Sequence, residues 1–158
     1  MRKLAAGVAG VLAVGLALAL AVARLERAPQ GAVEPVWDHD ACAHCGMHVS
    51  DRRFAAEVQT EDGRTLFFDD PGCLLAWRET APEPARAVYF HALDGERWLA
   101  ESEVEFVATR PTPMDWGLGA VPARTPGAMP LAAARRRIAE RGAAEAAGEE
   151  GAHASQPR

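Results

Sequence analysis

The most hydrophobic part of the chain is its first 23 residues. Arg2 and Lys3 precede an uncharged run over residues 4–23 that consists mostly of Ala, Leu, Val and Gly. A helix of this length just crosses the hydrocarbon core of a bilayer, and positive charge before the run directs everything after it out of the cytoplasm. The small-x-small triplet at residues 21–23 also fits a signal-peptidase site. Residues 1–23 are therefore predicted to be a membrane anchor or a cleaved signal peptide.

Residues 24–36, which follow, show no apolar period. Pro29, Gly31 and Pro35 interrupt regular structure in this stretch. We therefore expect a linker that lets the folded part stand off the membrane. The folded region is expected to begin at Trp37.

Alternating and apolar segments over residues 37–92 predict a first ββαβ unit. Its strands are expected at residues 54–60, 65–68 and 86–91, and its helix is expected between Asp70 and Thr80. Asp62-Gly63 supplies the turn chemistry that hairpins favour. Asp70 is a good helix N-cap, and Pro71 suits the first helical position.

Residues 93–141 partly repeat this order and predict a second unit. Its strands are expected at residues 98–99, 104–107 and 117–121, and residues 128–141 have a helical composition. The predicted fold class is therefore α+β, with two small related ββαβ units after an N-terminal hydrophobic helix. A closing strand for the second unit is not evident. Residues 142–158 are rich in Gly, Ala and Glu and are expected to form a disordered tail.

The charge of the chain excludes some classes of function. The 158 residues carry a formal net charge of −5. Because residues 1–27 are mainly basic among their charged side chains, the rest is more acidic still. Nucleic-acid binding requires a basic surface, so no nucleic-acid partner is expected. No Ser-His-Asp arrangement or phosphate-binding glycine loop is recognisable, so the protein is not expected to be an enzyme.

The densest group of reactive side chains lies at residues 38–48. Cys42 and Cys45 are two residues apart, so their sulfurs can converge on one metal ion or join as a disulfide. Gly46 tolerates the positive φ that lets a backbone wrap a site. Met47 adds a soft thioether, and thiolate with thioether is a donor set suited to Cu(I). Metal binding, thiol redox chemistry and a purely structural role all remain open from the residues alone.

Two distant residues are further candidates for this site. Cys73 falls in the first turn of the predicted helix, where a thiolate is favoured; the alternative is a buried apolar residue. Met114 lies on a proline-rich loop that is expected to be exposed and to present Met114 and Trp116. It is a plausible distant copper ligand, or else a core residue.

Four motifs carry a family resemblance: Cys42-x-x-Cys45-Gly46-Met47-x-Val49, Phe67-x-Asp69-Asp70-x-Gly72-Cys73, Trp98-Leu99 and Thr112-Pro113-Met114. Over roughly residues 40–141 the chain resembles the NosL family, the accessory proteins of nitrous-oxide reductase maturation. The resemblance implies a periplasmic, membrane-attached Cu(I) metallochaperone that delivers copper to nitrous-oxide reductase together with an ABC-type membrane complex. It also implies copper ligation by Cys45, Met47 and Met114, with Cys42 close behind. The family's usual lipidated cysteine is replaced here by the hydrophobic run.

Two rival classes share part of this pattern. A zinc- or heavy-metal-binding knuckle of the YHS or TRASH type also carries a similar cysteine box with a later cysteine. Met114 separates the two, because zinc has little use for a thioether. A thiol oxidoreductase would need its Cys-x-x-Cys at a helix N-terminus after a strand, and the sequence before Cys42 predicts no such strand.

Overall fold

The computed structural model describes residues 14–18, 22, 30–80 and 84–154, in two units, Met1–Gly31 and Ala32–Arg158. In the first unit residues 14–18 are helical. The rest of the predicted anchor or signal segment, except residue 22, and the first part of the predicted linker lie outside the described residues. Among the residues that are described, none of the helices has both the length and the apolar character needed to span a bilayer.

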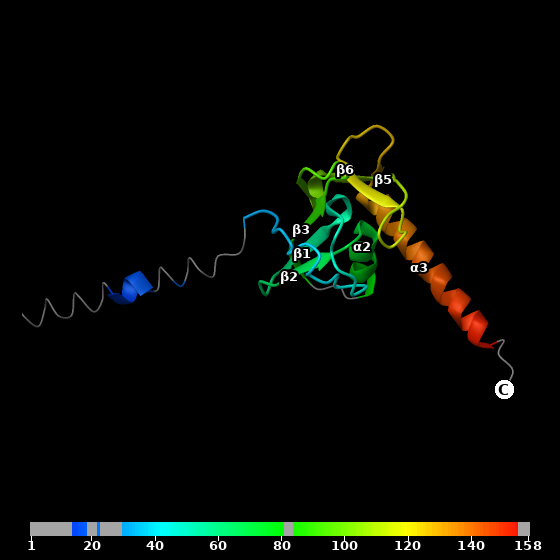
Figure 1. Cartoon of the computed structure of the whole chain (residues 1–158), viewed down its shortest axis with the longest axis horizontal. Helices are drawn as coiled ribbons and strands as arrows, with labels where there is room; N and C mark the ends of the chain where they lie inside the picture. The colour runs from blue at the N-terminus through cyan, green and yellow to red at the C-terminus, as the bar shows by residue number, and fades with distance from the viewer. Residues whose placement is uncertain (1–13, 19–21, 23–29, 81–83, 155–158) are drawn as a thin grey trace, which may run out of the picture. The chain divides into compact units, whose positions relative to one another are not determined.

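The second unit begins with a four-stranded antiparallel sheet (Figure 1). Its strands, in the spatial order β2-β1-β3-β4, are β2 (Thr65–Phe68), β1 (Ala56–Thr60), β3 (Ala85–His91) and β4 (Trp98–Ala100). A short 3-10 helix, Arg52–Phe54, precedes β1. Every residue of β1 is buried, because this strand is paired on both edges and covered by helix α2 (Pro71–Thr80).

Two predicted local signals are confirmed in this sheet. Gly63 adopts a φ of 89° in the turn between β1 and β2, as the Asp-Gly pair predicts. At the start of α2, Oδ1 of Asp70 accepts a hydrogen bond of 2.8 Å from the Gly72 N–H. Asp70 is thus the N-cap, and Pro71 is the first helical residue.

A smaller antiparallel sheet follows, in the order β6-β5-β7. Its elements are the 3-10 helix Glu101–Glu103, β5 (Val104–Ala108), β6 (Leu118–Pro122), β7 (Met129–Pro130) and helix α3 (Leu131–Ala154). Phe106 of β5 meets Phe90 of β3 edge to face, with ring centroids 5.1 Å apart, so the two sheets share one core. The predicted α+β class is confirmed, and it is built from two small antiparallel sheets and a few helices.

The finer arrangement differs from two equivalent units. Strand β4, expected in the second unit, pairs with β3 in the first sheet. The reason is the tight turn at Gly95, whose φ is 77° and whose N–H bonds the carbonyl of Ala92. After α3, no further strand occurs among the described residues, so the second sheet has no closing strand there.

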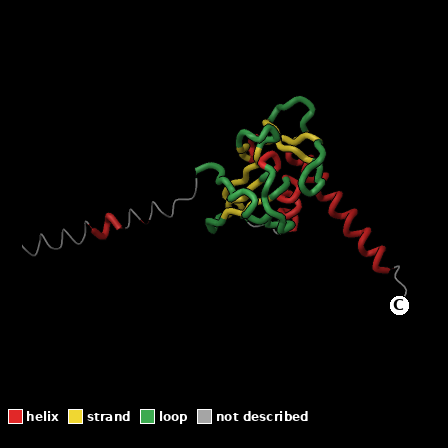
Figure 2. The backbone as a smooth tube through the Cα atoms, in the orientation of Figure 1, coloured by secondary structure: helices red, strands yellow, loops and turns green. Residues whose placement is uncertain are grey.

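Helix α3 also runs further than its composition suggests. It continues to Ala154, so residues 142–154 are helical where a disordered tail was predicted. Figure 2 shows this helix extending beyond the strands. Its first turns are held by buried Ala134 and Ile138. Beyond them the helix consists largely of Ala and Glu, which are strong helix formers. The lack of large apolar residues in this stretch argues against packing in a core, but it does not prevent a helix.

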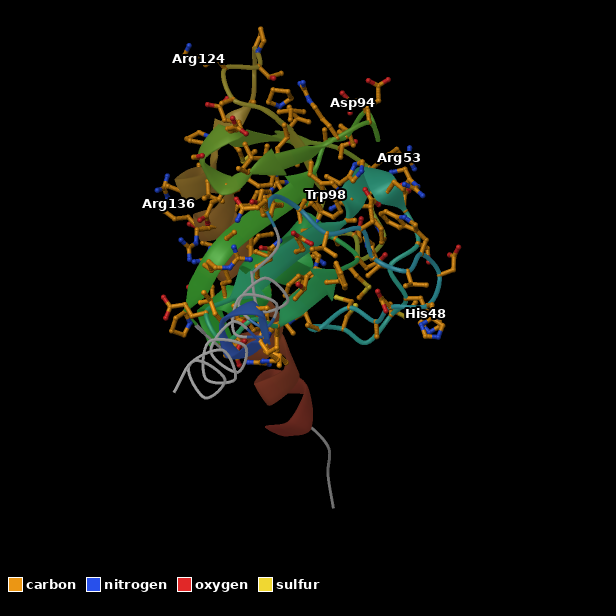
Figure 3. The ribbon with its side chains drawn as sticks, turned by 90° about the vertical axis from the view of Figure 1, so that its left-hand side faces the viewer. His48, Arg53, Asp94, Trp98, Arg124 and Arg136 are labelled. Atoms are coloured by element: carbon orange, nitrogen blue, oxygen red, sulfur yellow. The ribbon has the colours of Figure 1, made fainter. Side chains whose placement is uncertain are left out.

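The second half of the predicted linker is attached to the first sheet. The Val33 N–H donates to both carboxylate oxygens of Glu57, at 3.1 and 3.0 Å. The indole N–H of Trp98 donates to Glu34 at 2.9 Å, and Trp98 lies on the same face as the chain leading into the sheet (Figure 3). Residues 33–34 are therefore part of the folded unit.

Candidate metal centre

The cysteine loop, residues 41–48, is a tight closed turn. Its ends are joined by a bridge between Ala41 and His48. Inside it, the Cys42 N–H donates to the carbonyl of Met47 at 2.7 Å, and the Gly46 N–H donates to the carbonyl of Cys42 at 2.9 Å. Gly46 has the positive φ that the sequence predicts, 76°. The loop thus directs its two cysteines towards one point.

The third cysteine comes from helix α2. The sulfurs of Cys42, Cys45 and Cys73 all lie within 4.8 Å of one another, and all three are free thiols. Two sulfurs that bind one ion at about 2.3 Å each are at most about 4.6 Å apart, so small side-chain movements suffice to hold a metal ion. Cys42 and Cys73 are buried, whereas Cys45 is half-buried. The centre therefore has an inner side and an outer side.

The three thiols differ in their pKa values. A hydrogen bond from Cys73 lowers the pKa of Cys42 to about 5, against the opposing effect of burial, and the backbone at Cys45, Asp69 and His44 adds to the lowering. The same hydrogen bond, together with burial, raises the pKa of Cys73. Burial raises the pKa of Cys45. At neutral pH the metal-free centre is thus one thiolate beside two thiols.

Asp70 connects the helix that carries Cys73 to the loop that carries Met114. Its Oδ1 caps α2, while its Oδ2 accepts from the Met114 N–H at 3.2 Å. Thr112 provides a further side-chain hydrogen bond to this carboxylate. Burial raises the pKa of Asp70, and these hydrogen bonds oppose that effect. Neighbouring Asp69 accepts from the Ser50 N–H at 3.3 Å, and burial raises its pKa to about 6.

The two candidate methionines have different surroundings. Met47 lies in the cysteine loop with a side chain that is 57% exposed. Met114 is half-buried and packs against the core, as does Trp116. The proline-rich loop is therefore less exposed than the sequence predicts, because the Met114 N–H is tied to buried Asp70. His48, at the end of the cysteine loop, points outwards (Figure 3).

Trp116 is the neighbour of the centre that the sequence reasoning did not assign to it. Its ring lies against Gly72, where an added Cβ would be 2.1 Å from the Trp116 Cγ. It makes a side-chain hydrogen bond to Cys73, and its ring centroid is 6.4 Å from that of His44. The available signal was the glycine itself, since a helix's first turn needs one only where something approaches closely.

A cavity of about 410 Å³ opens beside the centre. It lies between α2 and α3, and its lining includes His44, Trp116, Glu79 and Ile138. His44 stands between the two cysteines in the sequence, so this hollow lies next to the cysteine loop.

No family model matches the chain, and neither a curated protein nor a solved structure matches it. The geometry by itself defines a class of site, a cluster of three cysteines that can hold one metal ion. Thiolate sulfur is a soft donor, which favours Cu(I) and Zn(II) over hard cations such as Mg²⁺ and Ca²⁺.

Proposed function

We propose that this protein is a Cu(I)-binding metallochaperone that takes its cargo at the three-cysteine centre. The observation that carries the proposal is the convergence of three sulfurs within 4.8 Å, two of them buried and one half-buried. Soft thiolates in a low coordination number match the preference of Cu(I). A site with one half-buried ligand also suits a carrier, because an incoming ligand can attack the metal there.

The transfer itself is a ligand exchange. Cys42, ionised at neutral pH, supplies the first bond, and binding by Cys45 and Cys73 then releases their protons. At the outer side, a sulfur or imidazole of the recipient displaces Cys45 first, since Cys45 is the least buried of the three. The inner pair, Cys42 and Cys73, releases the ion last.

The NosL resemblance supports the choice of recipient. Three of its motifs, spread between Cys42 and Met114, meet around Asp70 and the cysteine loop. We propose nitrous-oxide reductase and its ABC-type maturation complex as the partners, on the periplasmic side of the inner membrane. The basic start and the uncharged run of residues 4–23 support the location and the attachment.

A metal titration tests the proposal. Reduced, metal-free protein is titrated with Cu(I) and with Zn(II) against chelators of known affinity, and the same is done for Met114→Leu and Met47→Leu. Leucine keeps the volume of the side chain roughly constant. A variant that loses affinity for Cu(I) and keeps its affinity for Zn(II) therefore identifies a thioether ligand. Met129→Leu is the matched control, because Met129 is also half-buried against the core. Absence of Cu(I) binding by the unmutated protein would refute the proposal.

One observation favours a second candidate, a zinc or heavy-metal knuckle. The three converged cysteines would need only His44, an exposed residue of the same loop, to complete the Cys₃His set that is common in structural zinc sites. In that case the protein binds Zn(II) more tightly than the chelators do, and His44→Ala lowers its affinity for Zn(II). Both methionine variants should then bind metal like the unmutated protein. The thiol-redox alternative has less support, because Cys42 and Cys45 lie in a loop and not at a helix N-terminus.

A further inference from the structure

Trp116 is held between two elements that are distant in sequence. On one side its ring fills the space that a side chain at residue 72 would occupy, with Cγ, Cβ and Cδ1 at 2.1, 2.3 and 2.7 Å from an added Cβ. On the other side the guanidinium carbon of Arg141 lies 4.7 Å from the ring centre. Arg141 also donates to the carbonyl of Asp115 at 2.6 Å. The indole is thus fixed by α2 below and by α3 above.

The position of the indole relates it to one sulfur in particular. Gly72 directly precedes Cys73 in the first turn of α2, and the indole is hydrogen-bonded to the Cys73 side chain. Cys73 is 0% exposed. Cys42, which is also buried, receives its hydrogen bonds from Cys73 and from the backbone at Cys45, Asp69 and His44, and none from Trp116 is among them. Removal of Trp116 should therefore uncover Cys73 and leave Cys42 as it is.

We infer that Trp116 is a positioning residue that closes the Cys73 side of the centre, and that Arg141 acts through Trp116 as a clamp. Access to the three sulfurs is then confined to the side of Cys45 and His44. The part of this inference that concerns metal exchange rests on the proposed function. The part that concerns the cover does not, because it can be measured on metal-free protein.

Alkylation of the thiols in the reduced, metal-free full chain tests the cover. The rate at each cysteine is read by mass spectrometry of peptides. In unmutated protein Cys73, which is buried and has a raised pKa, should react last. In Trp116→Ala we expect Cys73 to react at least about tenfold faster, because its protection then depends only on local opening, while the rate at Cys42 stays the same. The control is Trp98→Ala, because Trp98 is bonded to Glu34 and not to Cys73. This variant should leave Cys73 protected.

A variant at the surface tests the clamp without touching the indole. Arg141→Gln removes the charge over the ring and should raise the Cys73 rate in the same direction but by less. Arg136→Gln, on the same helix and exposed, should have no effect. If Arg141 acts through Trp116, the double variant Trp116→Ala/Arg141→Gln should match Trp116→Ala alone. Additive effects would overturn the clamp.

The variant Arg141→Gln also guards against general unfolding. If Trp116→Ala raises the rates of Cys42 and Cys73 together, the decision falls to Arg141→Gln, which leaves the indole in place. Faster reaction at Cys73 alone in Arg141→Gln supports the inference. An unchanged rate at Cys73, or equal increases at Cys42 and Cys73, overturns it.

Copper provides a separate readout. Binding of Cu(I) next to an indole should quench its fluorescence, and Trp116→Phe should remove that change while Trp98→Phe retains it. Removal of copper by a chelator should be faster in Trp116→Ala than in unmutated protein. If no copper binds, the proposed function fails and the alkylation result still decides on the cover. If copper binds, and the chelator removes it from Trp116→Ala at the same rate as from the unmutated protein, the Trp116 cover does not control metal exchange.

Discussion

Two buried clusters of polar groups lie in the first half of the folded unit, and they differ in which groups the buried atoms contact. Glu57 is completely buried, yet both its oxygens accept the Val33 N–H and one also accepts from the Gln59 side chain at 2.8 Å. Cys42 and Cys73 are also buried, and their sulfurs converge with that of Cys45 at one point. The first cluster is complete in its own hydrogen bonds, whereas the second brings together three sulfurs that could hold a metal ion.

The contrast separates a structural cluster from a binding one. Burial of a polar group is costly unless it is hydrogen-bonded, and at Glu57 the chain itself supplies those bonds. At the cysteines the same cost is reduced by keeping two thiols protonated and one ionised, as the opposite pKa shifts indicate. Such a centre can replace two protons by one cation. Burial alone therefore does not mark a candidate site, whereas a group of buried thiols that share their protons does.

The largest expected effect is the loss of one sulfur. Cys73→Ser or Cys45→Ser should lower Cu(I) affinity by more than about 100-fold, since a lost ligand costs more than a lost outer-shell partner. Competition with a chelator under reducing conditions measures this. Glu57→Gln is the matched variant from the other cluster and should bind within about twofold of the unmutated protein, because distant sites are independent. Equal losses in all three would remove the distinction between the clusters.

The next effect is the pH dependence of binding. Cys42 is already ionised at pH 7, with a pKa of about 5, whereas the pKa values of Cys45 and Cys73 are raised. Binding by all three thiolates should therefore release about two protons at pH 7, and affinity should fall as the pH falls. Calorimetry in buffers of different ionisation enthalpy counts the protons. If no protons are released, Cys45 and Cys73, whose pKa values are raised, do not bind the metal.

A smaller effect concerns the packing behind the centre. Gly72→Ala introduces a Cβ into the ring of Trp116 and should lower the free energy of unfolding by about 1–3 kcal/mol, as overpacking does. Gly142→Ala is the control within a helix, since nothing lies within 4 Å of its added Cβ; it should stabilise by up to about 1 kcal/mol. Denaturant titrations of the two variants compare them directly. A neutral Gly72→Ala would show that the ring is not fixed there.

A last effect is expected from the complete cluster. Burial raises the pKa of Glu57 from 4.5 to about 7, so the folded protein binds a proton there that the unfolded chain has already lost. The free energy of unfolding should therefore decrease as the pH rises from about 4.5 to about 7, and change no further above that value on account of Glu57. Glu57→Gln should flatten this slope, leaving the part that Asp69, with a pKa near 6, contributes in the same direction. An unchanged slope would place the titrating group elsewhere.

The sequence was informative wherever the signal is local. The Asp-Gly turn, the cap at Asp70 and the positive φ of Gly46 are each set by one or two residues, and each is found where it was predicted. The strands of the first sheet lie within two residues of their predicted bounds. The place of Cys73 in the first turn of α2 is also a local property, and the structure brings its sulfur to those of Cys42 and Cys45.

Long-range features were less predictable. The exchange of β4 between units depends on which edge of a sheet is open, and the attachment of Val33 depends on a buried carboxylate 24 residues away. Met114 and Trp116 looked exposed because prolines surround them, but Asp70 and Gly72 bring them onto the core. The pairing of β4 and the attachment of Val33 leave no period or motif at either partner, whereas the one signal for the position of Trp116 was Gly72.

The centre has a timing consequence, because its parts come from segments around residues 42–45, 73, 116 and 141. Such a site is absent from a chain that is only partly folded, which offers just the pair Cys42 and Cys45. Under the proposed function, Cu(I) binds the native state far better than any earlier one, so the ion draws the folding equilibrium towards completion by mass action. A newly made chain would then reach its finished form more fully when its cargo is present, and each delivery would leave the carrier less stable than before.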